Sequence, residues 1–337
     1  MQIVRDPGAC PRPEQGTIVT IGAYDGLHLG HRRVIADVCA RARAGDHLSA
    51  VVTFDRHPAQ VIRPESAPRL LTGLDQKLEL LESTGVDIVV VIHFDEVRAA
   101  EPPEDFVRTV LVDCLNAKGI VVGEDFHFGH RRAGNVALLA EMGADLGFEV
   151  SGMRLVGPDG EPARDDAQVS STAIRRALIE GRLDDANRML GRHHEMRGPV
   201  TEGDRRGREL GFPTANVAIS DDMLMPADGI YAGHLRLLDG GPADTADLPS
   251  SLPSGRPARR RGPDLPSAIY VGHRPTFYDD QAATLLEVHV LDFTGDLYGA
   301  EVAVTFEHRL RGDIAFDDVE SLRAQLAADC EQAAGLL

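Results

Sequence analysis

The chain of 337 residues lacks tryptophan and is very poor in lysine. Only Lys77 and Lys118 are lysines among its 35 basic residues, so arginine supplies the rest. Acidic residues number 53, which leaves a net charge of -18. General nucleic-acid binding depends on surface cations that neutralise phosphates, so this charge argues against it. We therefore expect no nucleic-acid partner.

Cysteine is also scarce. Cys10, Cys39, Cys114 and Cys330 lie far apart and form no CxxC unit. Such spacing is untypical of a zinc site or of a disulfide framework, so we expect reduced thiols.

Long apolar runs are missing as well. The longest strongly apolar stretch, "IVVVI" at 88–92, is far too short to cross a bilayer, and residues 1–16 carry charges and prolines where a signal peptide needs an apolar run. These features predict a cytoplasmic protein with no membrane partner. The oligomeric state is left open, and a weak homo-oligomer is compatible with the sequence.

The first half alternates short β-branched runs with segments of helical periodicity. This alternation predicts an α/β domain with a parallel, Rossmann-like sheet covered on both faces. The expected strands are 17–22, 48–54, 86–94 and 119–123, and the expected helices are 31–43, 74–83, 104–116 and 134–147.

The second half has a different pattern. Residues 169–191 predict two short helices, and after His193 come alternating strands broken by glycine and proline, which predict an antiparallel β-barrel or sandwich followed by a helix near 317–334. We place the domain boundary near 186–195, giving domains 1–188 and 189–337. The Pro-, Gly- and Ser-rich segment 239–267 is interpreted as a surface loop between two strands.

The stretch "GAYDGLHLGHRR" (22–33) joins the first expected strand to the first expected helix. Backbone N–H groups at a helix N-terminus favour anions, and Gly30 lets a phosphate approach the backbone closely. His28 and His31 can donate hydrogen bonds to phosphoryl oxygens as charge develops. A zinc pair is disfavoured, because its usual form is HExxH within a helix and no third ligand is evident. HxGH at this turn therefore favours phosphate binding.

A second motif, "VSSTAIR" (169–175), opens a later helix. Its hydroxyls can cap the helix and Arg175 offers a guanidinium suited to phosphate. Alone it is typical of an ordinary N-cap; after HxGH it is similar to the second signature of the nucleotidyltransferase superfamily.

Four further blocks narrow the resemblance. "VTFDRHP" (52–58), "VVGEDFHFG" (121–129), "RELGFPTANV" (208–217) and "LEVHVLDFTGDLYG" (286–299) occur in this order. With the two motifs above, the chain resembles the bacterial bifunctional riboflavin kinase/FMN adenylyltransferases, the prokaryotic FAD synthetases. The resemblance implies a nucleotidyltransferase domain followed by a riboflavin kinase β-barrel, and it covers almost the whole chain.

For the first half, the resemblance implies adenylyl transfer from ATP to FMN. His28, His31 and Arg175 would be catalytic. Residues implied to bind ATP phosphate are Gly22, Tyr24, Gly30, Ser171 and Thr172. Residues implied to contact the flavin are His57, Asp125, Phe126 and Phe128, although the two phenylalanines alternate in a way that also suits core packing.

For the second half, the resemblance implies phosphorylation of riboflavin by MgATP, without a P-loop. Thr214 and Asn216 would bind Mg²⁺ and ATP phosphate, with Gly211 and Pro213 beside them. Glu287 would be the catalytic base, and Arg311 would lie near the flavin. The implied small molecules are therefore ATP, riboflavin, FMN and FAD, with Mg²⁺ as the cofactor.

Several positions depart from the family pattern, namely Arg56, Arg208, His273 and Arg274. None removes Thr214, Asn216 or Glu287. Two alternatives remain: an HxGH transferase with another acceptor, such as a cytidylyltransferase or a pantetheine-phosphate adenylyltransferase, and a flavin-binding protein that has lost catalysis. The PTAN block in the second half argues against the first of them.

Overall fold

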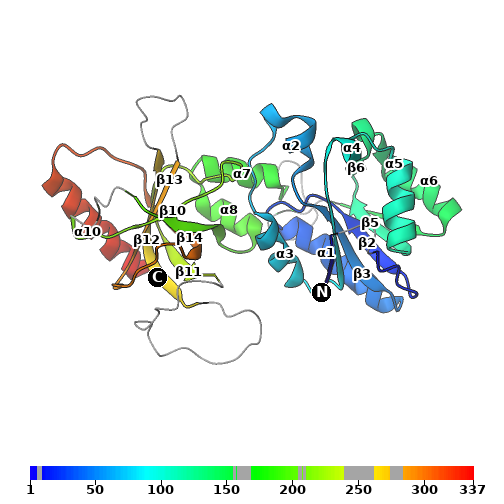
Figure 1. Ribbon diagram of the computed structural model, residues 1–337, viewed down its shortest axis with the longest axis horizontal. Coiled ribbons are helices and arrows are strands. Elements are labelled where there is room, and N and C mark those ends of the chain that lie inside the picture. Colours follow the sequence, from blue (N-terminus) through cyan, green and yellow to red (C-terminus); the bar gives the residue numbers. More distant parts are fainter. Residues whose placement is uncertain are drawn as a thin grey trace. The chain divides into compact units, whose positions relative to one another are not determined.

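The computed structural model describes residues 1–5, 10–154, 157, 168–203, 207, 210–238, 262–273 and 284–337. The chain forms two compact units, Met1–Ala173 and Ile174–Leu337 (Figure 1). The expected boundary between residues 188 and 189 stays a prediction. Within the described residues, no helix is long and apolar enough to cross a membrane.

The first unit is built on the expected parallel sheet. Its strands run in the order β1-β4-β3-β2-β5-β8, and all five neighbouring pairs are parallel. The strands are β1 (Gln2–Val4), β2 (Thr17–Ile21), β3 (Leu48–Phe54), β4 (Ile88–Ile92), β5 (Ala117–Gly123) and β8 (Glu149–Met153). The two edge strands escape prediction from sequence, because β1 has three residues and β8 contains no fully buried residue.

Helices cover both faces of this sheet, as alternating side chains along the strands require. On one face, α1 (Leu29–Ala44) and α3 (Leu74–Glu82) pack against Val89 and Val91. On the other, the π-helical segment η3 (Val107–Cys114) and α6 (Val136–Leu146) pack against Val90 and Ile92. The shorter elements are α2 (Pro58–Ile62), η2 (Pro64–Ser66), α4 (Glu96–Ala99), α5 (Pro103–Phe106), β6 (His127–Phe128), η4 (His130–Arg132) and β7 (Gly134–Asn135).

The strand order places a topological switch point at β2. The chain proceeds from β2 to β3 and β4 on one side and then returns to β5 on the other side of β2. In such sheets ligands bind outside the carboxyl ends of the strands at this point. The HxGH turn follows β2, and the segment containing Asp125 follows β5.

One expectation about the cysteines is wrong. Cys10 and Cys114 form a disulfide across 104 residues, with their Cα atoms 4.8 Å apart. The segment before β2 lies against the end of η3, where the Arg12 amide donates to the Cys114 carbonyl at 2.9 Å. This contact between distant segments brings the two sulfur atoms together, and the spacing of the cysteines in the sequence does not predict it. Cys39 and Cys330 are free thiols, as expected.

The second unit begins with two helices and continues as the expected antiparallel barrel. Helix α7 (Ser171–Ile179) starts in the first unit, and α8 (Leu183–Leu190) follows it. The closed barrel has the order β10-β13-β12-β11-β14-β9. Its strands are β9 (His194–Thr201), β10 (Ala215–Val217), β11 (Gly229–Leu237), β12 (Asp264–His273), β13 (Thr284–Val290) and β14 (Glu301–Arg311).

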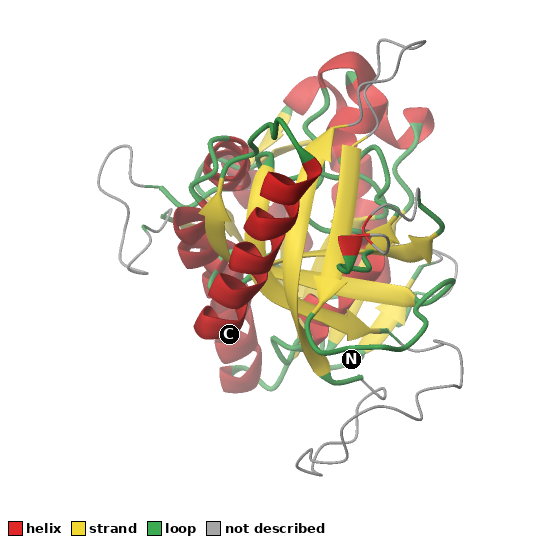
Figure 2. Ribbon diagram, turned by 90° about the vertical axis from the view of Figure 1, so that its left-hand side faces the viewer, coloured by secondary structure: helices red, strands yellow, loops and turns green. Residues whose placement is uncertain are grey.

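The terminal helix α10 (Val319–Leu336) packs along the outside of the barrel, against β11 and β12 (Figure 2). Small side chains make the close approach feasible, since Ala333 of the helix meets Ala232 and Ala268 of the strands. The loop expected at 239–267 ends earlier than predicted, because residues 264–267 belong to β12. Residues 239–261 lie outside the described part of the chain.

Candidate active sites

The HxGH turn lies at the carboxyl end of β2 and opens helix α1. His28 is the N-cap of α1: it is 5% exposed, and its Nδ1 accepts the His31 amide at 3.4 Å. Because Nδ1 accepts, the ring proton of neutral His28 is on Nε2. The two imidazole rings are stacked, with centroids 3.6 Å apart and planes at 19°. In the sequence Gly30 lies between the two histidines, in the first turn of α1.

Tyr24 supports this pair from the core. Its ring forms a T-shaped contact with the His31 ring, with centroids 5.0 Å apart, and its hydroxyl pairs with Thr20 Oγ1 at 2.7 Å. Burial raises the pKa of Tyr24, against which the Thr20 hydrogen bond acts. The residue has φ +50°, a conformation that costs a non-glycine residue energy, so its surroundings must hold it there. Gly22 lies against the same ring, where a Cβ would come within 3.1 Å of it.

Asp25 fixes the turn to the segment preceding α3. Its buried carboxylate accepts the Leu71 amide at 2.9 Å and the Thr72 amide at 3.0 Å. The Gly26 amide in turn donates to Thr72 Oγ1 at 3.0 Å. These hydrogen bonds fix the conformation of the turn, and a site for phosphate transfer requires such preorganisation.

The start of α7 also reaches this turn. Ser171 Oγ donates to the Asp25 carbonyl at 2.9 Å, and Ser170 Oγ caps the helix by accepting the Ala173 amide at 3.1 Å. The structure thus brings the two superfamily motifs together. Thr172 is exposed in this first turn, while Arg175 lies further along α7, in the second unit.

The segment after β5 carries the expected flavin contacts. Asp125 is exposed, whereas Phe126 and Phe128 stack on each other at 5.4 Å and pack against the core beside Phe106. The core therefore fixes the positions of both rings, which follow β5 next to the switch point.

His57 follows β3 and caps α2. Its Nδ1 accepts the Ala59 amide at 3.1 Å, and Gln60 Oε1 accepts the His57 amide at 2.9 Å, which completes a capping box. The adjacent Arg56 is exposed and lies 3.7 Å from Asp55 Oδ1. His57 thus has a local structural role, and its contact with flavin stays a prediction.

In the second unit, three expected residues meet at the short strand β10. Thr214 Oγ1 lies 3.4 Å from Glu287 Oε2, and Asn216 is paired with Glu287 across β10 and β13. Directly paired residues of an antiparallel ladder extend from the same face of the sheet. The structure therefore places a hydroxyl, an amide and a carboxylate side by side.

Two glycines shape the chain around this group. Gly211 has φ +92°, which disfavours any side chain there, and a Cβ on Gly203 would come within 2.2 Å of the Asn216 amide. The backbone thus approaches Asn216 closely from the preceding loop.

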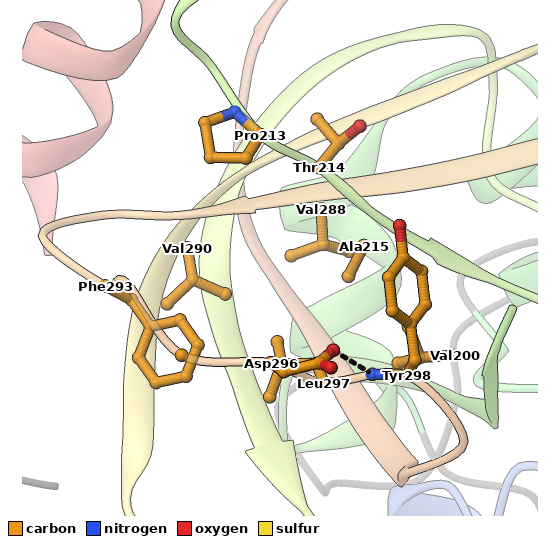
Figure 3. A pocket seen from close by; sticks show the side chains of 11 residues that line it. Val200, Pro213, Thr214, Ala215, Val288, Val290, Phe293, Asp296, Leu297 and Tyr298 are labelled. Carbon is orange, nitrogen blue, oxygen red and sulfur yellow. Dashed lines mark hydrogen bonds between the residues drawn. The ribbon is translucent and has the colours of Figure 1, made fainter. Parts of the chain in front are cut away.

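A pocket opens beside the same residues (Figure 3). Pro213 and Thr214 form one wall, and the segment after β13 forms another, where the Asp296 carboxylate accepts the Tyr298 amide at 3.0 Å. The complete lining is Val200, Pro213, Thr214, Ala215, Val288, Val290, Phe293, Gly295, Asp296, Leu297 and Tyr298. Apolar side chains such as Val288, Val290 and Phe293 and polar groups such as Thr214 and Asp296 therefore line the pocket together.

Comparisons with known proteins agree with this two-site architecture. The family model described as FAD synthetase matches residues 10–173, and that described as riboflavin kinase matches residues 190–337. The bifunctional riboflavin kinase/FMN adenylyltransferase of Haemophilus influenzae is 33% identical over 333 residues, covering 99% of this chain and 98% of the relative. That of Listeria monocytogenes is 35% identical over 313 residues, covering 93% and 90%. This chain belongs to that family.

A solved structure of similar fold exists as well. A Streptococcus pneumoniae crystal structure, described as a macrolide-efflux protein, matches with a TM-score of 0.78 at 27% identity and covers 98% of both chains. The likeness in fold therefore extends over both units of this chain.

Among the family positions singled out in the sequence, Arg311 has a clear structural partner. Its Nε and Nη2 donate to the two carboxylate oxygens of Asp329 on α10, at 3.0 and 2.6 Å, and Nη1 donates to the Gly312 carbonyl at 3.0 Å. Asp329 is almost completely buried and also accepts from Gln325. Arg311 thus fixes α10 to the barrel, and its proximity to flavin stays a prediction.

This arrangement predicts that Asp329→Ala destabilises the second unit by about 3 kcal/mol, because it leaves the Arg311 guanidinium half-buried without its carboxylate. The urea concentration that halves riboflavin phosphorylation should fall. Glu331→Ala removes an exposed carboxylate from the same helix and should leave that midpoint unchanged. An unchanged midpoint for Asp329→Ala would contradict the role of the pair.

The remaining family departures lie outside the described residues or side chains. Arg208 and Arg274 are not described, and of His273 only the backbone is described. Sequence reasoning in turn missed Asp25 as a support, Lys77, and the pocket wall 293–298. For Lys77 the composition held a signal, since it is one of two lysines in the chain.

Proposed function

We propose that this member of the family makes FAD in two steps, phosphorylating riboflavin in the barrel unit and adenylylating the resulting FMN in the α/β unit. The observation that supports this most is that each unit contains its own preorganised group. These are the stacked His28–His31 pair at a switch point and the Thr214–Asn216–Glu287 group beside a pocket.

In the adenylyl step, an oxygen of the FMN phosphate attacks the α-phosphorus of ATP. The bond from that phosphorus to the bridging oxygen breaks, and pyrophosphate leaves with the electron pair. The α1 N-terminus, His28 and His31 stabilise the developing negative charge, while Gly22 and Gly30 admit the phosphates to the backbone. Ser171, Thr172 and Arg175 bind phosphate from α7, and His57, Asp125, Phe126 and Phe128 contact the flavin.

In the kinase step, Glu287 accepts the proton of the riboflavin 5′-hydroxyl. The oxygen of this hydroxyl attacks the γ-phosphorus of ATP, and ADP leaves. The Thr214 hydroxyl orients the Glu287 carboxylate through their 3.4 Å contact. Phosphoryl transfer depends mainly on positioning and charge stabilisation, so one carboxylate suffices as the base. Gly211 and Pro213 contact ATP, and Arg311 lies on the flavin side.

Thr214 and Asn216 fit a Mg²⁺ ion by the chemistry of their donors, since both present oxygen atoms next to a carboxylate. The described residues include no group of three or more His, Cys, Asp or Glu arranged to hold a metal, so ATP phosphates would complete the coordination. When bound, the ion neutralises charge on the transferred phosphoryl group.

We further propose domains 1–188 and 189–337 and a cytoplasmic location, where ATP is available. Weak self-association is compatible with the function and is not required by it. We do not extend macrolide efflux to this chain, because both family matches and the named bifunctional relatives indicate transferase chemistry.

The test is an assay of the purified full chain with riboflavin, ATP and Mg²⁺, with products separated chromatographically. We expect FMN to form first and FAD to follow with release of pyrophosphate. FMN without FAD would contradict the adenylyl step. Flavin binding without turnover would indicate a binding protein instead.

A further inference from the structure

Lys77 is the only lysine of the chain that is buried, its one counterpart Lys118 being exposed on β5. It lies in α3, is 7% exposed, and extends to the carboxyl ends of two neighbouring strands. Its Nζ donates to the Phe54 carbonyl at 2.9 Å and to the Ala23 carbonyl at 3.2 Å. The ammonium therefore links the end of β3 to the first residues of the HxGH turn.

The turn is held at two points, one on α3 and one on the segment just before it. Asp25 accepts the amides of Leu71 and Thr72 just before α3, and Lys77 donates to Ala23 from the first turn of α3. Between these two points lies Tyr24, with φ +50° and its ring in a T-shaped contact with the His31 ring. The hydrogen bonds of Ala23 and Asp25, on either side of Tyr24, hold it at a positive φ that is unfavourable for an unconstrained residue.

We propose that Lys77 is a positioning residue for adenylyl transfer: through Ala23 and Tyr24 it sets the orientation of His31 at the phosphate site. This rests on the proposed role of the HxGH turn. Lys77 itself does not contact the substrate in this scheme. A displacement of about 1 Å in a catalytic group can cost roughly 100-fold in rate, so such a support has a measurable effect.

Lysine suits this position better than arginine, although the chain uses arginine at almost every other basic position. A compact ammonium carries three donors that can reach separate nearby oxygens, whereas a planar guanidinium is larger and suits a bidentate partner. The charged groups that face Lys77 are Asp25, from the turn after β2, and Asp55, after β3. Asp55 is itself bonded to His93 and to the Phe94 amide.

Titration offers a distinctive readout. Desolvation lowers the pKa of Lys77 to about 8, against which Asp25 and Asp55 act. As pH rises through this value the ammonium loses one donor and its charge, so the orientation of His31 and the rate of FAD formation should change together. The linked stability has the opposite sign: the folded chain binds fewer protons than the unfolded chain between about pH 8 and the ordinary lysine value, so its free energy of unfolding rises there. Unfolding linked to Lys77 therefore cannot explain an alkaline loss of activity.

The test uses the full chain with Lys77→Met, Lys77→Arg and the exposed control Lys118→Arg. We expect Lys77→Met to lower kcat for FMN adenylylation by about 100-fold with KM for FMN little changed, and Lys77→Arg to fall between it and wild type. Lys118→Arg should match wild type. Riboflavin phosphorylation, in the other unit, should be unchanged in all three.

A second measurement does not depend on turnover. The ring-proton NMR signal of His31, assigned with a His31→Ala variant, should show an inflection near pH 8 in wild type and in Lys118→Arg. It should lack this inflection in Lys77→Met and Lys77→Arg. If the chain makes no FAD, the proposed function fails while this titration still tests the link. A wild-type kcat in Lys77→Met, or an inflection that persists in both variants, would overturn the proposal.

Discussion

Replacing His31 with alanine should slow conversion of FMN to FAD by about 100-fold or more, the usual cost of losing a donor that acts in the transition state. Riboflavin phosphorylation should continue at the wild-type rate, because its residues belong to the other unit. The two rates can be measured on one sample by supplying FMN or riboflavin with MgATP. The stacked geometry with His28 gives the reason for a large effect: removal of one ring also frees the other to move.

A matched control is His47→Ala. His47 precedes β3 at the amino edge of the same sheet, where its Nδ1 contacts the Gln15 carbonyl at 2.5 Å. It lies at the opposite end of the strands from the HxGH turn, so its loss should leave FAD formation intact. An equal drop in both activities for His31→Ala would indicate misfolding, and full retention would remove His31 from the reaction.

Replacing Glu287 with glutamine should have the second large effect. General-base catalysis contributes about 100- to 10,000-fold, so FMN formation should fall by that order. The amide keeps the size of the side chain and its contact with Thr214, and it loses the ability to take the hydroxyl proton. FAD formation from added FMN should be unaffected.

Glu301→Gln provides the comparison, since Glu301 is an exposed carboxylate at the start of another barrel strand, β14. It should retain both activities. Retained kinase activity in Glu287→Gln would show that another group takes the proton, and loss of FAD formation as well would point to a general defect.

Much of the architecture could be predicted from the sequence because its signals are local. Strands β2 and β4 are unbroken β-branched runs, β3 and β5 each contain a shorter one, and the HxGH turn follows β2 directly. The barrel strands after His193 were expected from their alternation, whereas β10, with three residues, is too short to show such a pattern.

Features that depend on distant segments could not be predicted in this way. The Cys10–Cys114 disulfide spans 104 residues, and the link from Lys77 to Ala23 and Phe54 exists only once α3 packs on the sheet. Arg311 was assigned by motif alone, whereas its carboxylate partner lies 18 residues further on, in a helix whose docking the sequence does not specify. Motifs thus predict which residues react, and this stays a prediction, whereas the tertiary contacts that hold these residues become known only from the structure.

The shortness of β10 has a consequence for folding. Two residue pairs join it to β13 and two join it to β9, and Asn216 takes part in both ladders. The seam that closes the barrel is therefore also the place where Asn216 and Glu287 become neighbours. The proposed kinase group is therefore incomplete in a chain whose barrel has not closed, even if the other strands have formed. Under the proposed mechanism, recovery of riboflavin phosphorylation during refolding consequently measures the time at which β10 pairs with β9 and β13 and closes the barrel.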